Sequence, residues 1–370
     1  MKDVWVAADS IVSPLGNSSA GNFEQLHKGI SGIAQLNDSS LSKTPIVAGK
    51  INAPHGTSSI TRLEAMCVSA IEEVTKRFSL PPERTIFILS TTKGNISTLE
   101  SGSASHPRIQ LHALSKFLAS KAGLEKHIVI SNACISGVMA LVVAKRYLQN
   151  GTYDHALVLG VDELSRFVVS GFQSLQALSN EVCRPFDADR KGINLGEAAA
   201  VMLVTSKPEE IGSEPKIRIL GAGLSNDANH ISGPSRTGAE LCSAITHALN
   251  ESRMTPGEMD FICAHGTATL YNDEMEAKAF HLAGLGDVPL NSLKPYYGHT
   301  LGAAGVVETT IGIHSLLNNI MIPTPGYSKS GVSMPVNVQR HVESKPLKTF
   351  LKTASGFGGC NAAIVLQKVN

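Results

Sequence analysis

The chain has 370 residues, a length that allows one large α/β unit or two domains around a sizeable core. Its 32 Lys and Arg residues nearly balance 31 Asp and Glu residues, and a net charge of +1 gives no sign of a nucleic-acid or membrane surface. Six cysteines are scattered without a CxxC spacing, which argues for reduced thiols. Residues 1–16 lack the pattern of a signal peptide and no apolar run is long enough to span a membrane, so we expect a cytoplasmic protein.

Apolar runs typical of strands alternate with helical patterns, which predicts an α/β fold with largely parallel strands. In the first part of the chain we expect strands at residues 4–7, 85–90, 127–131, 155–160 and 198–205. The helices expected there cover residues 23–29, 61–77 and 138–148. Residues 91–111 contain no clear period, and we interpret them as an irregular loop over the site or an interface segment.

Residues 206–215 are polar and rich in residues that break helices and strands, which makes them the best boundary in the chain. The same order of elements then begins again, with strands expected at residues 216–221, 261–264 and 362–366 and helices at residues 238–251 and 302–317. The sequence therefore predicts two halves, residues 1–205 and 216–370, which pack as one unit.

Cys134 lies where the strand expected at residues 127–131 meets the helix that follows it. A sulfur at the start of a helix faces unpaired backbone N–H groups, which favour a thiolate over a thiol. We therefore interpret Cys134 as a candidate nucleophile. The alternative is a small core residue, because free cysteines are among the most buried residue types.

Two histidines in the second half have positions that suit catalysis. His265 directly follows an apolar strand, and Thr267 and Thr269 come two and four positions later. His299 precedes a helix of small residues, and Lys294 lies five positions before it. Close to a helix N-terminus His299 should stay uncharged, so that a ring N–H can donate to a developing oxyanion.

Each of these features has a simpler explanation when it is taken alone. A histidine beside a strand is usually an ordinary core or surface residue, and a glycine-rich turn with one aromatic ring, such as that around Phe357, is usually only a turn. Two histidines can bind a metal, but neither an i, i+4 pair nor a carboxylate at ligand spacing accompanies them, so we predict no metal. The joint occurrence of the cysteine, both histidines and the lysine is what favours an active site.

The segments NACISG, HGTATLYNDEMEA, NSLKPYYGHTLGAAG and GFGGCNAAIVL resemble those of the elongating β-ketoacyl-acyl-carrier-protein synthases. These are the decarboxylating condensing enzymes of fatty-acid and polyketide assembly, and the similarity covers nearly the whole chain. The resemblance implies a thiolase-like fold of five layers, αβαβα, built from two pseudo-repeated halves. It also implies a dimer formed through a strand of the first half, and no metal or dissociable cofactor.

The resemblance further implies a role for each site residue. Cys134 would carry the acyl group, while His265 and His299 would hold the malonyl thioester carbonyl as it becomes an enolate during loss of CO₂. The backbone N–H groups of Cys134 and Phe357 would receive the oxyanion. The remaining residues implied are Lys294 with Glu276 as a charged pair, Thr267 and Thr269 for the phosphopantetheine arm, and Phe172 and Phe357 at the acyl pocket.

Some positions depart from the family pattern. Ser355 and Ile193 stand where aromatic residues are usual, so we expect a reshaped acyl pocket. Gln176 replaces a basic residue that often contacts the carrier, and Arg62 is a weaker candidate for that contact.

The partners implied are acyl carrier protein and a second subunit, either identical or a different ketosynthase-like chain. Fatty-acid, polyketide and aryl-polyene-type pathways are all compatible with the sequence. Two other functions stay open. One is a chain-length or partner subunit, although such subunits usually lack the nucleophile. The other is a cofactor-independent thiolase, for which Cys360 in the last glycine-rich turn suggests itself as the base.

Overall fold

The computed structural model describes residues 2–52, 59–102, 106–210 and 216–369. Its main sheet has ten strands in the order β11-β10-β14-β15-β9-β1-β8-β6-β4-β5. The strands of the first half are β1 (Trp5–Val12), β4 (Thr85–Ser90), β5 (His127–Ile130), β6 (His155–Asp162) and β8 (Ala198–Thr205). Those of the second half are β9 (Lys216–Asn226), β10 (Phe261–Cys263), β11 (Leu290–Asn291), β14 (Thr349–Gly356) and β15 (Cys360–Val369).

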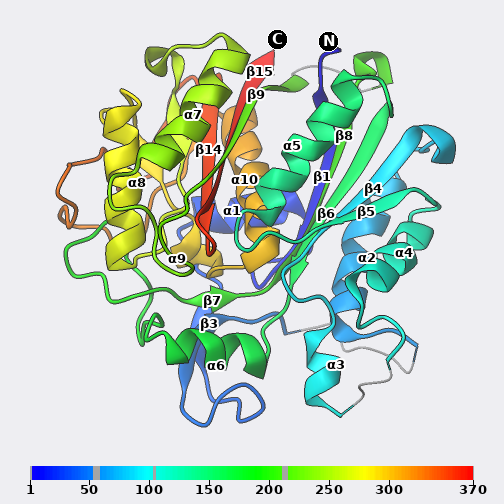
Figure 1. Cartoon of the computed structure of the whole chain (residues 1–370), viewed down its shortest axis with the longest axis horizontal. Coiled ribbons are helices and arrows are strands. Elements are labelled where there is room, and N and C mark those ends of the chain that lie inside the picture. The colour runs from blue at the N-terminus through cyan, green and yellow to red at the C-terminus, as the bar shows by residue number, and fades with distance from the viewer. Residues whose placement is uncertain (1, 53–58, 103–105, 211–215, 370) are drawn as a thin grey trace.

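Helices cover both outer faces and fill the space between the two five-stranded halves of this sheet (Figure 1). The outer helices are α2 (Arg62–Thr75) and α4 (Leu111–Lys121) on the first half, and α7 (Ala239–Ser252) and α8 (Leu270–Leu282) on the second. The inner helices are α5 (Ser136–Gln149) and α10 (Ala304–Asn318), with α1 (Ser19–His27) beside them. The result is the expected thiolase-like arrangement of five layers, αβαβα.

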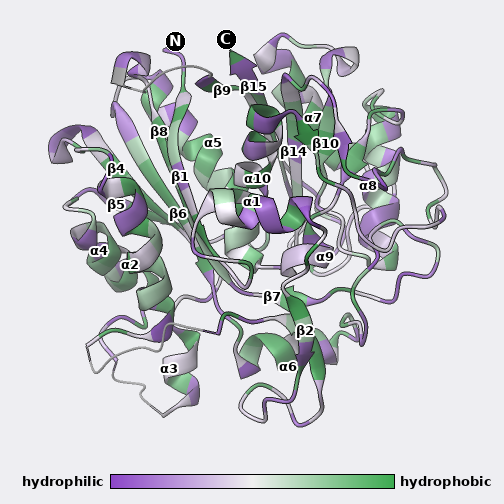
Figure 2. Cartoon of the chain, turned by 180° about the vertical axis from the view of Figure 1, so that it is seen from behind, coloured by the Kyte–Doolittle hydropathy of each residue, from purple (hydrophilic) through white to green (hydrophobic). Residues whose placement is uncertain are grey.

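The main core lies in the middle layer, where Val138 and Leu141 of α5 pack in the same cluster as Val306 and Ile311 of α10. Strand β6 is buried along its whole length, and Figure 2 shows it to be largely apolar, as are its neighbours. Two further apolar clusters lie beneath the outer helices, one in each half. Every layer is therefore held by burial of apolar side chains.

The expectation of largely parallel strands is wrong. Strand β4 pairs in parallel with β5 and β6, and β10 pairs in parallel with β11 and β14, but β1, β8, β9 and β15 form only antiparallel pairs. The two halves show the same pattern and are joined by an antiparallel contact between β1 and β9. Strand β8 is buried on both faces, so its sequence has the continuous apolar character that parallel strands usually show.

Most predicted elements are confirmed, and β4 and β8 have the predicted bounds. Strand β1 extends beyond residues 4–7 because its polar residues are accommodated: Asp9 pairs with His314 of α10, and Ser10 is buried. Residues 211–215 lie outside the described residues, and the boundary between the halves at residues 206–215 stays a prediction. None of the described helices combines the length and apolar composition needed to cross a bilayer.

A group of smaller elements lies at the end of the sheets opposite the chain termini (Figure 1). It contains β2 (Ile33–Leu36), β3 (Ile46–Gly49), β7 (Leu195–Gly196), α3 (Ile96–Glu100) and α6 (Arg166–Ser174). Residues 91–111, which we expected to be irregular, include α3, and residues 103–105 lie outside the described residues. A short helix, α9 (Lys294–Tyr297), precedes α10, and β12 (Ile320–Met321) pairs with β13 (Glu343–Ser344) in a separate two-stranded sheet.

Candidate active site

Cys134 lies in a tight turn between β5 and α5, one residue before the N-cap Ile135. The preceding Ala133 has a φ of 44°, an uncommon conformation for a residue with a side chain. The Ser136 hydroxyl stabilises the turn, because it donates to the Ala133 carbonyl at 2.6 Å and accepts from the Asn132 N–H at 2.7 Å. This turn directs Cys134 into a cavity that its sulfur shares with residues of the second half.

The expectation that Cys134 rests as a thiolate is wrong. Burial raises the pKa of its thiol to about 12, and the neighbouring Cys360 acts in the same direction. Lys294 and a hydrogen bond from the Phe357 backbone N–H lower the pKa, but they do not outweigh the loss of water. The resting nucleophile is therefore a protonated thiol.

Alkylation of Cys134 by iodoacetamide should become faster from about pH 7 to about pH 10 without reaching a plateau. Only the thiolate reacts, and its fraction rises about tenfold per pH unit below the pKa. Peptide mass spectrometry gives the rate, with the half-exposed Cys242 in the same digest as an internal reference. A plateau at Cys134 near pH 8 contradicts the raised pKa.

His265 follows β10, and its backbone is fixed by buried charged groups. Its N–H donates to a carboxylate oxygen of Glu276 at 2.8 Å, and its carbonyl accepts from Lys294 Nζ at 3.1 Å. Burial, then Lys294, His299 and Lys352, hold the pKa of His265 well below its ordinary value. The imidazole is therefore uncharged.

His299 is held by the small strand β7 and its neighbours. The His299 N–H donates to the Asn194 carbonyl at 2.7 Å, and its carbonyl accepts from the Gly196 N–H at 3.0 Å. Burial first, then Lys294 and Lys352, keep the pKa of His299 well below its ordinary value. The predicted uncharged state is confirmed, but its main cause is burial, because α10 begins only at Ala304.

The cysteine and both histidines meet in one place. The Cys134 sulfur and one ring nitrogen of each histidine all lie within 4.8 Å of one another. Nδ1 of His265 and both ring nitrogens of His299 are buried without a hydrogen-bond partner among the described residues. Both histidines also line the cavity that Cys134 faces, so their rings are placed beside the space that a substrate can enter.

One sulfur and two imidazoles are also a ligand set that Zn²⁺ accepts. The electrostatic surroundings are unfavourable for a divalent cation, because Lys294 and Lys352 both lower the pKa of the two imidazoles and would also repel a metal ion. The arrangement is better suited to a developing negative charge.

The expected pairing of Lys294 with Glu276 is wrong. Lys294 forms its ion pair with Glu308 of α10, which also binds Lys352 of β14. Glu276 instead accepts the backbone N–H groups of His265 and Gly266, at 2.8 and 2.6 Å. It does not line the cavity, so it positions His265 and does not bind substrate directly.

A cavity of about 560 Å³ opens in front of the cysteine and the histidines. Thr267 and Thr269 line it, with their hydroxyl oxygens 2.8 Å apart. Phe172 and Phe357 also line it and stack on each other, with ring centroids 5.9 Å apart. These four residues face the same space as the cysteine and the histidines.

Two family models match the two halves of the chain. The model described as "Beta-ketoacyl synthase, N-terminal domain" matches residues 114–210, and "Beta-ketoacyl synthase, C-terminal domain" matches residues 217–328. The first range contains Cys134, and the second contains His265 and His299. The chain belongs to the β-ketoacyl synthase family.

Curated members of the family from fatty-acid and polyketide synthesis are about equally similar to the chain in sequence. The chain is 32% identical over 257 residues to "3-oxoacyl-[acyl-carrier-protein] synthase 2" of Rhizobium meliloti (strain 1021), covering 65% of this chain and 60% of that protein. It is 30% identical over 271 residues to "Tetracenomycin polyketide synthase ketoacyl synthase alpha subunit" of Streptomyces glaucescens, covering 69% and 63%. The chain thus spans about 60% of the length of the curated relatives that it matches.

A solved structure matches over the full length of the chain. It is the ketosynthase ApeO in complex with its chain length factor ApeC from Xenorhabdus doucetiae, with a TM-score of 0.87 and 27% identity. The match covers 100% of this chain and 98% of that chain. The fold of this family member is therefore that of ketosynthases.

The positions that depart from the family pattern occupy different places. Ile193 and Ser355 line the cavity, and the Ser355 hydroxyl donates to the Asn361 side chain at 2.8 Å. The Arg62 guanidinium is paired with Glu197 and donates to the Ile51 carbonyl at 2.9 Å. A contact between Arg62 and the carrier stays a prediction, which this internal pairing disfavours.

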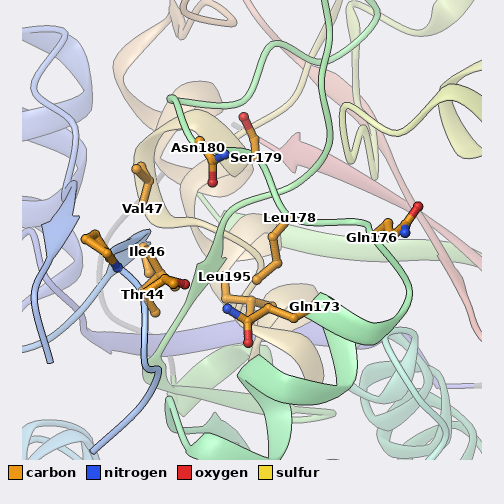
Figure 3. Close-up of a pocket in the computed structure, with 11 residues that line it drawn as sticks. Thr44, Ile46, Val47, Gln173, Gln176, Leu178, Ser179, Asn180 and Leu195 are labelled. Atoms are coloured by element: carbon orange, nitrogen blue, oxygen red, sulfur yellow. The ribbon is translucent and has the colours of Figure 1, made fainter. Parts of the chain in front are cut away.

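Gln176 lines the main cavity and also a smaller one of about 150 Å³. Figure 3 shows Ile46, Leu178 and Leu195 grouped at the smaller cavity, while the Gln176 amide lies to one side. An uncharged residue thus stands between the two hollows, where the family often has a basic one.

The sequence analysis missed Glu308 and Lys352, although both left a signal. Glu308 is the one acidic residue within α10, and Lys352 is the one charged residue within β14. A single charged group in a buried element requires a partner, and these two residues are each other's partner.

Proposed function

We propose that this chain catalyses a decarboxylating condensation of an acyl thioester with malonyl-acyl carrier protein, giving a β-ketoacyl-carrier product. The observation that carries the proposal is the convergence of the Cys134 sulfur with two uncharged, unpartnered imidazoles. The reaction needs one nucleophile and two neutral donors near one oxygen, and the three converging side chains have the chemistry that these roles require.

In the first step the Cys134 sulfur attacks the carbonyl of an acyl-carrier thioester. The bond from carbonyl carbon to carrier sulfur breaks, and the thiol proton passes to the departing carrier sulfur. The Phe357 N–H, which already bonds to the Cys134 sulfur, lies where the oxyanion would form. The acyl chain then occupies the cavity lined by Phe172 and Ile193.

In the second step malonyl carrier enters and its thioester carbonyl accepts from His265 and His299. Loss of CO₂ leaves an enolate whose oxygen these two imidazoles stabilise. The enolate carbon attacks the acyl carbonyl on Cys134, the carbon–sulfur bond breaks, and the thiolate takes up a proton. Uncharged donors suit this step, because an imidazolium would also bind the malonyl carboxylate and stabilise the ground state.

The carrier would dock at the mouth of the cavity. Four exposed apolar side chains line that mouth: Leu175, Leu270, Tyr271 and Phe357. We propose that these apolar side chains contribute to carrier binding.

We propose that a second subunit adds to strand β5, the edge strand of the main sheet that belongs to the first half. An identical subunit is the simpler case, while the ApeO complex with its chain length factor is a precedent for a different one. Light scattering of the purified chain separates these cases: a dimer of the chain alone supports the first, and a monomer that assembles only with another ketosynthase-like chain supports the second.

Cys134→Gln should abolish condensation and retain CO₂ release from malonyl carrier, because the two imidazoles that hold the enolate are untouched. Radioactive CO₂ release and β-ketoacyl product are measured in parallel, with Cys242→Ser on the surface of α7 as the control. Loss of both activities tells against the histidines acting on their own.

The alternative functions receive less support. A non-catalytic partner subunit does not require the two buried, unpartnered histidines that this site contains. A thiolase base should face the nucleophile across the cavity, but Cys360 does not line it, and its thiol donates to the carbonyls of Asn132 and Phe357. If wild-type protein neither releases CO₂ nor accepts an acyl group, the partner role becomes the better explanation.

A further inference from the structure

Two lysines, Lys294 and Lys352, contact the backbone that leads to His265. Lys294 and Lys352 are both fully buried, and both bind the single carboxylate of Glu308. Burial lowers the pKa of Lys352, but Cys263 and Glu308 raise it above its ordinary value. Burial raises the pKa of Glu308, yet the two lysines bring it below its ordinary value. Two buried lysine side chains therefore share one buried carboxylate.

The two ammonium groups also bind three successive carbonyls of the segment that carries His265. Lys352 Nζ donates to the carbonyls of Cys263 and Ala264 at 3.3 and 3.2 Å. Lys294 Nζ donates to the His265 carbonyl at 3.1 Å. The backbone that leads into the active site is therefore fixed by charged hydrogen bonds at every residue from 263 to 265.

The pairing register of β10 and β14 places Lys352 beside the backbone of residues 263 and 264. Cys263 of β10 lies opposite Lys352 of β14 in a parallel pair, so the lysine side chain starts beside the end of β10. It reaches Glu308 on α10, in the middle layer of the molecule. Both imidazoles experience its charge, since it contributes to the low pKa of each.

We propose that Lys352 is a second positioning residue, beside Lys294, which fixes the His265 backbone and holds both imidazoles in the uncharged state that enolate formation needs. This inference rests on the proposed function for its catalytic part. Its electrostatic part concerns the resting protein alone.

Other titratable groups lie on the elements around the two imidazoles, and the experiment must keep them unchanged. They are Cys134 before α5, Cys263 on β10, Asp273 and Glu276 on α8, Lys294 on α9 and Glu308 on α10. Removal of Lys352 leaves Glu308 in its ion pair with Lys294, so the Glu308 carboxylate keeps a partner in the core.

The test uses Lys352→Met and Lys352→Gln in the full chain. Methionine removes the charge and the donors, whereas glutamine keeps donors near the Glu308 and backbone oxygens without the charge. Lys145→Met is the matched control, because Lys145 is also buried and paired, with Glu251, but lies about 13 Å along α5 from its first residue, Ser136.

Nuclear magnetic resonance follows the imidazole titrations of His265 and His299 without substrate, assigned with single histidine variants. We expect both Lys352 variants to raise the titration midpoint of at least one imidazole, and Lys145→Met to change neither. The acidic limb of malonyl-carrier decarboxylation should move to higher pH by a similar amount. If the methionine variant does not fold, the glutamine variant decides the matter by the same two measurements.

Unchanged imidazole midpoints in a folded Lys352 variant overturn the proposal. So does a rate that falls by one factor at every pH with no movement of the acidic limb, because that is the signature of a merely structural role. A wild-type protein that is silent toward malonyl carrier counts against the proposed function, while the titration of the resting protein still tests the effect of Lys352.

Discussion

His265→Ala should lower the rate of CO₂ release from malonyl carrier by about 10²–10³-fold, the usual loss for one deleted oxyanion donor. His299→Ala should cause a loss of similar size, because the two rings converge with Cys134 and present unpartnered nitrogens. A stopped assay of released CO₂ at saturating malonyl carrier measures both effects.

The control is His247→Ala, since His247 is exposed on α7 and should leave the rate unchanged. The double variant, with both active-site histidines replaced, gives a further check. If the two rings hold the same oxygen, the double loss should be smaller than the product of the single losses. Single variants that retain wild-type rates would contradict the assignment of the enolate site.

Gly305→Ala should both destabilise the fold and lower the activity. An added Cβ at Gly305 would lie 2.3 Å from the Val138 backbone nitrogen and 2.7 Å from the Gly137 carbonyl carbon. The contact between α10 and α5 must then open, at a cost of about 1–3 kcal/mol in the free energy of unfolding. Because α5 carries the turn with Cys134, a shift of about 1 Å should cost about 10²-fold in condensation rate.

Gly171→Ala is the matched control for this change. Gly171 also lies in a helix, α6, but an added Cβ there meets nothing within 4 Å. Urea unfolding should show a lower free energy of unfolding for Gly305→Ala than for the wild type. Gly171→Ala should not lower it, because alanine has a higher helix propensity than glycine. Equal stability of the two variants would mean that α5 and α10 tolerate a wider separation.

The site could be predicted from sequence where local pattern and position agree. Cys134 follows a clear strand, and His265 follows another, so both side chains were expected at strand ends in a common region. The close approach that the small residues at 302–305 allow is confirmed by the contact of Gly305 with α5. These features depend on neighbours along the chain.

The charged partners depend instead on packing between distant elements. Glu276 and Glu308 both lie on helices that follow His265 in the chain, and only the fold decides which carboxylate reaches Lys294. The ammonium of Lys352 comes from a third element, β14. Sequence distance could not distinguish among them.

Protonation was the least predictable property. The position of Cys134 near a helix start suggested a thiolate, whereas burial raises the pKa of its thiol to about 12. The direction of strands was also mistaken, since burial on both faces gives antiparallel β8 the composition of a parallel strand. In both cases the deciding factor is exclusion of water by distant parts of the chain.

The most direct measurement is peptide mass spectrometry after incubation with an acyl-carrier thioester, repeated after addition of malonyl carrier. The account predicts an acyl group on the peptide that contains Cys134, its disappearance when malonyl carrier is added, and a β-ketoacyl group on the carrier. An acyl group on a different cysteine, or one on Cys134 that malonyl carrier does not remove, would contradict it.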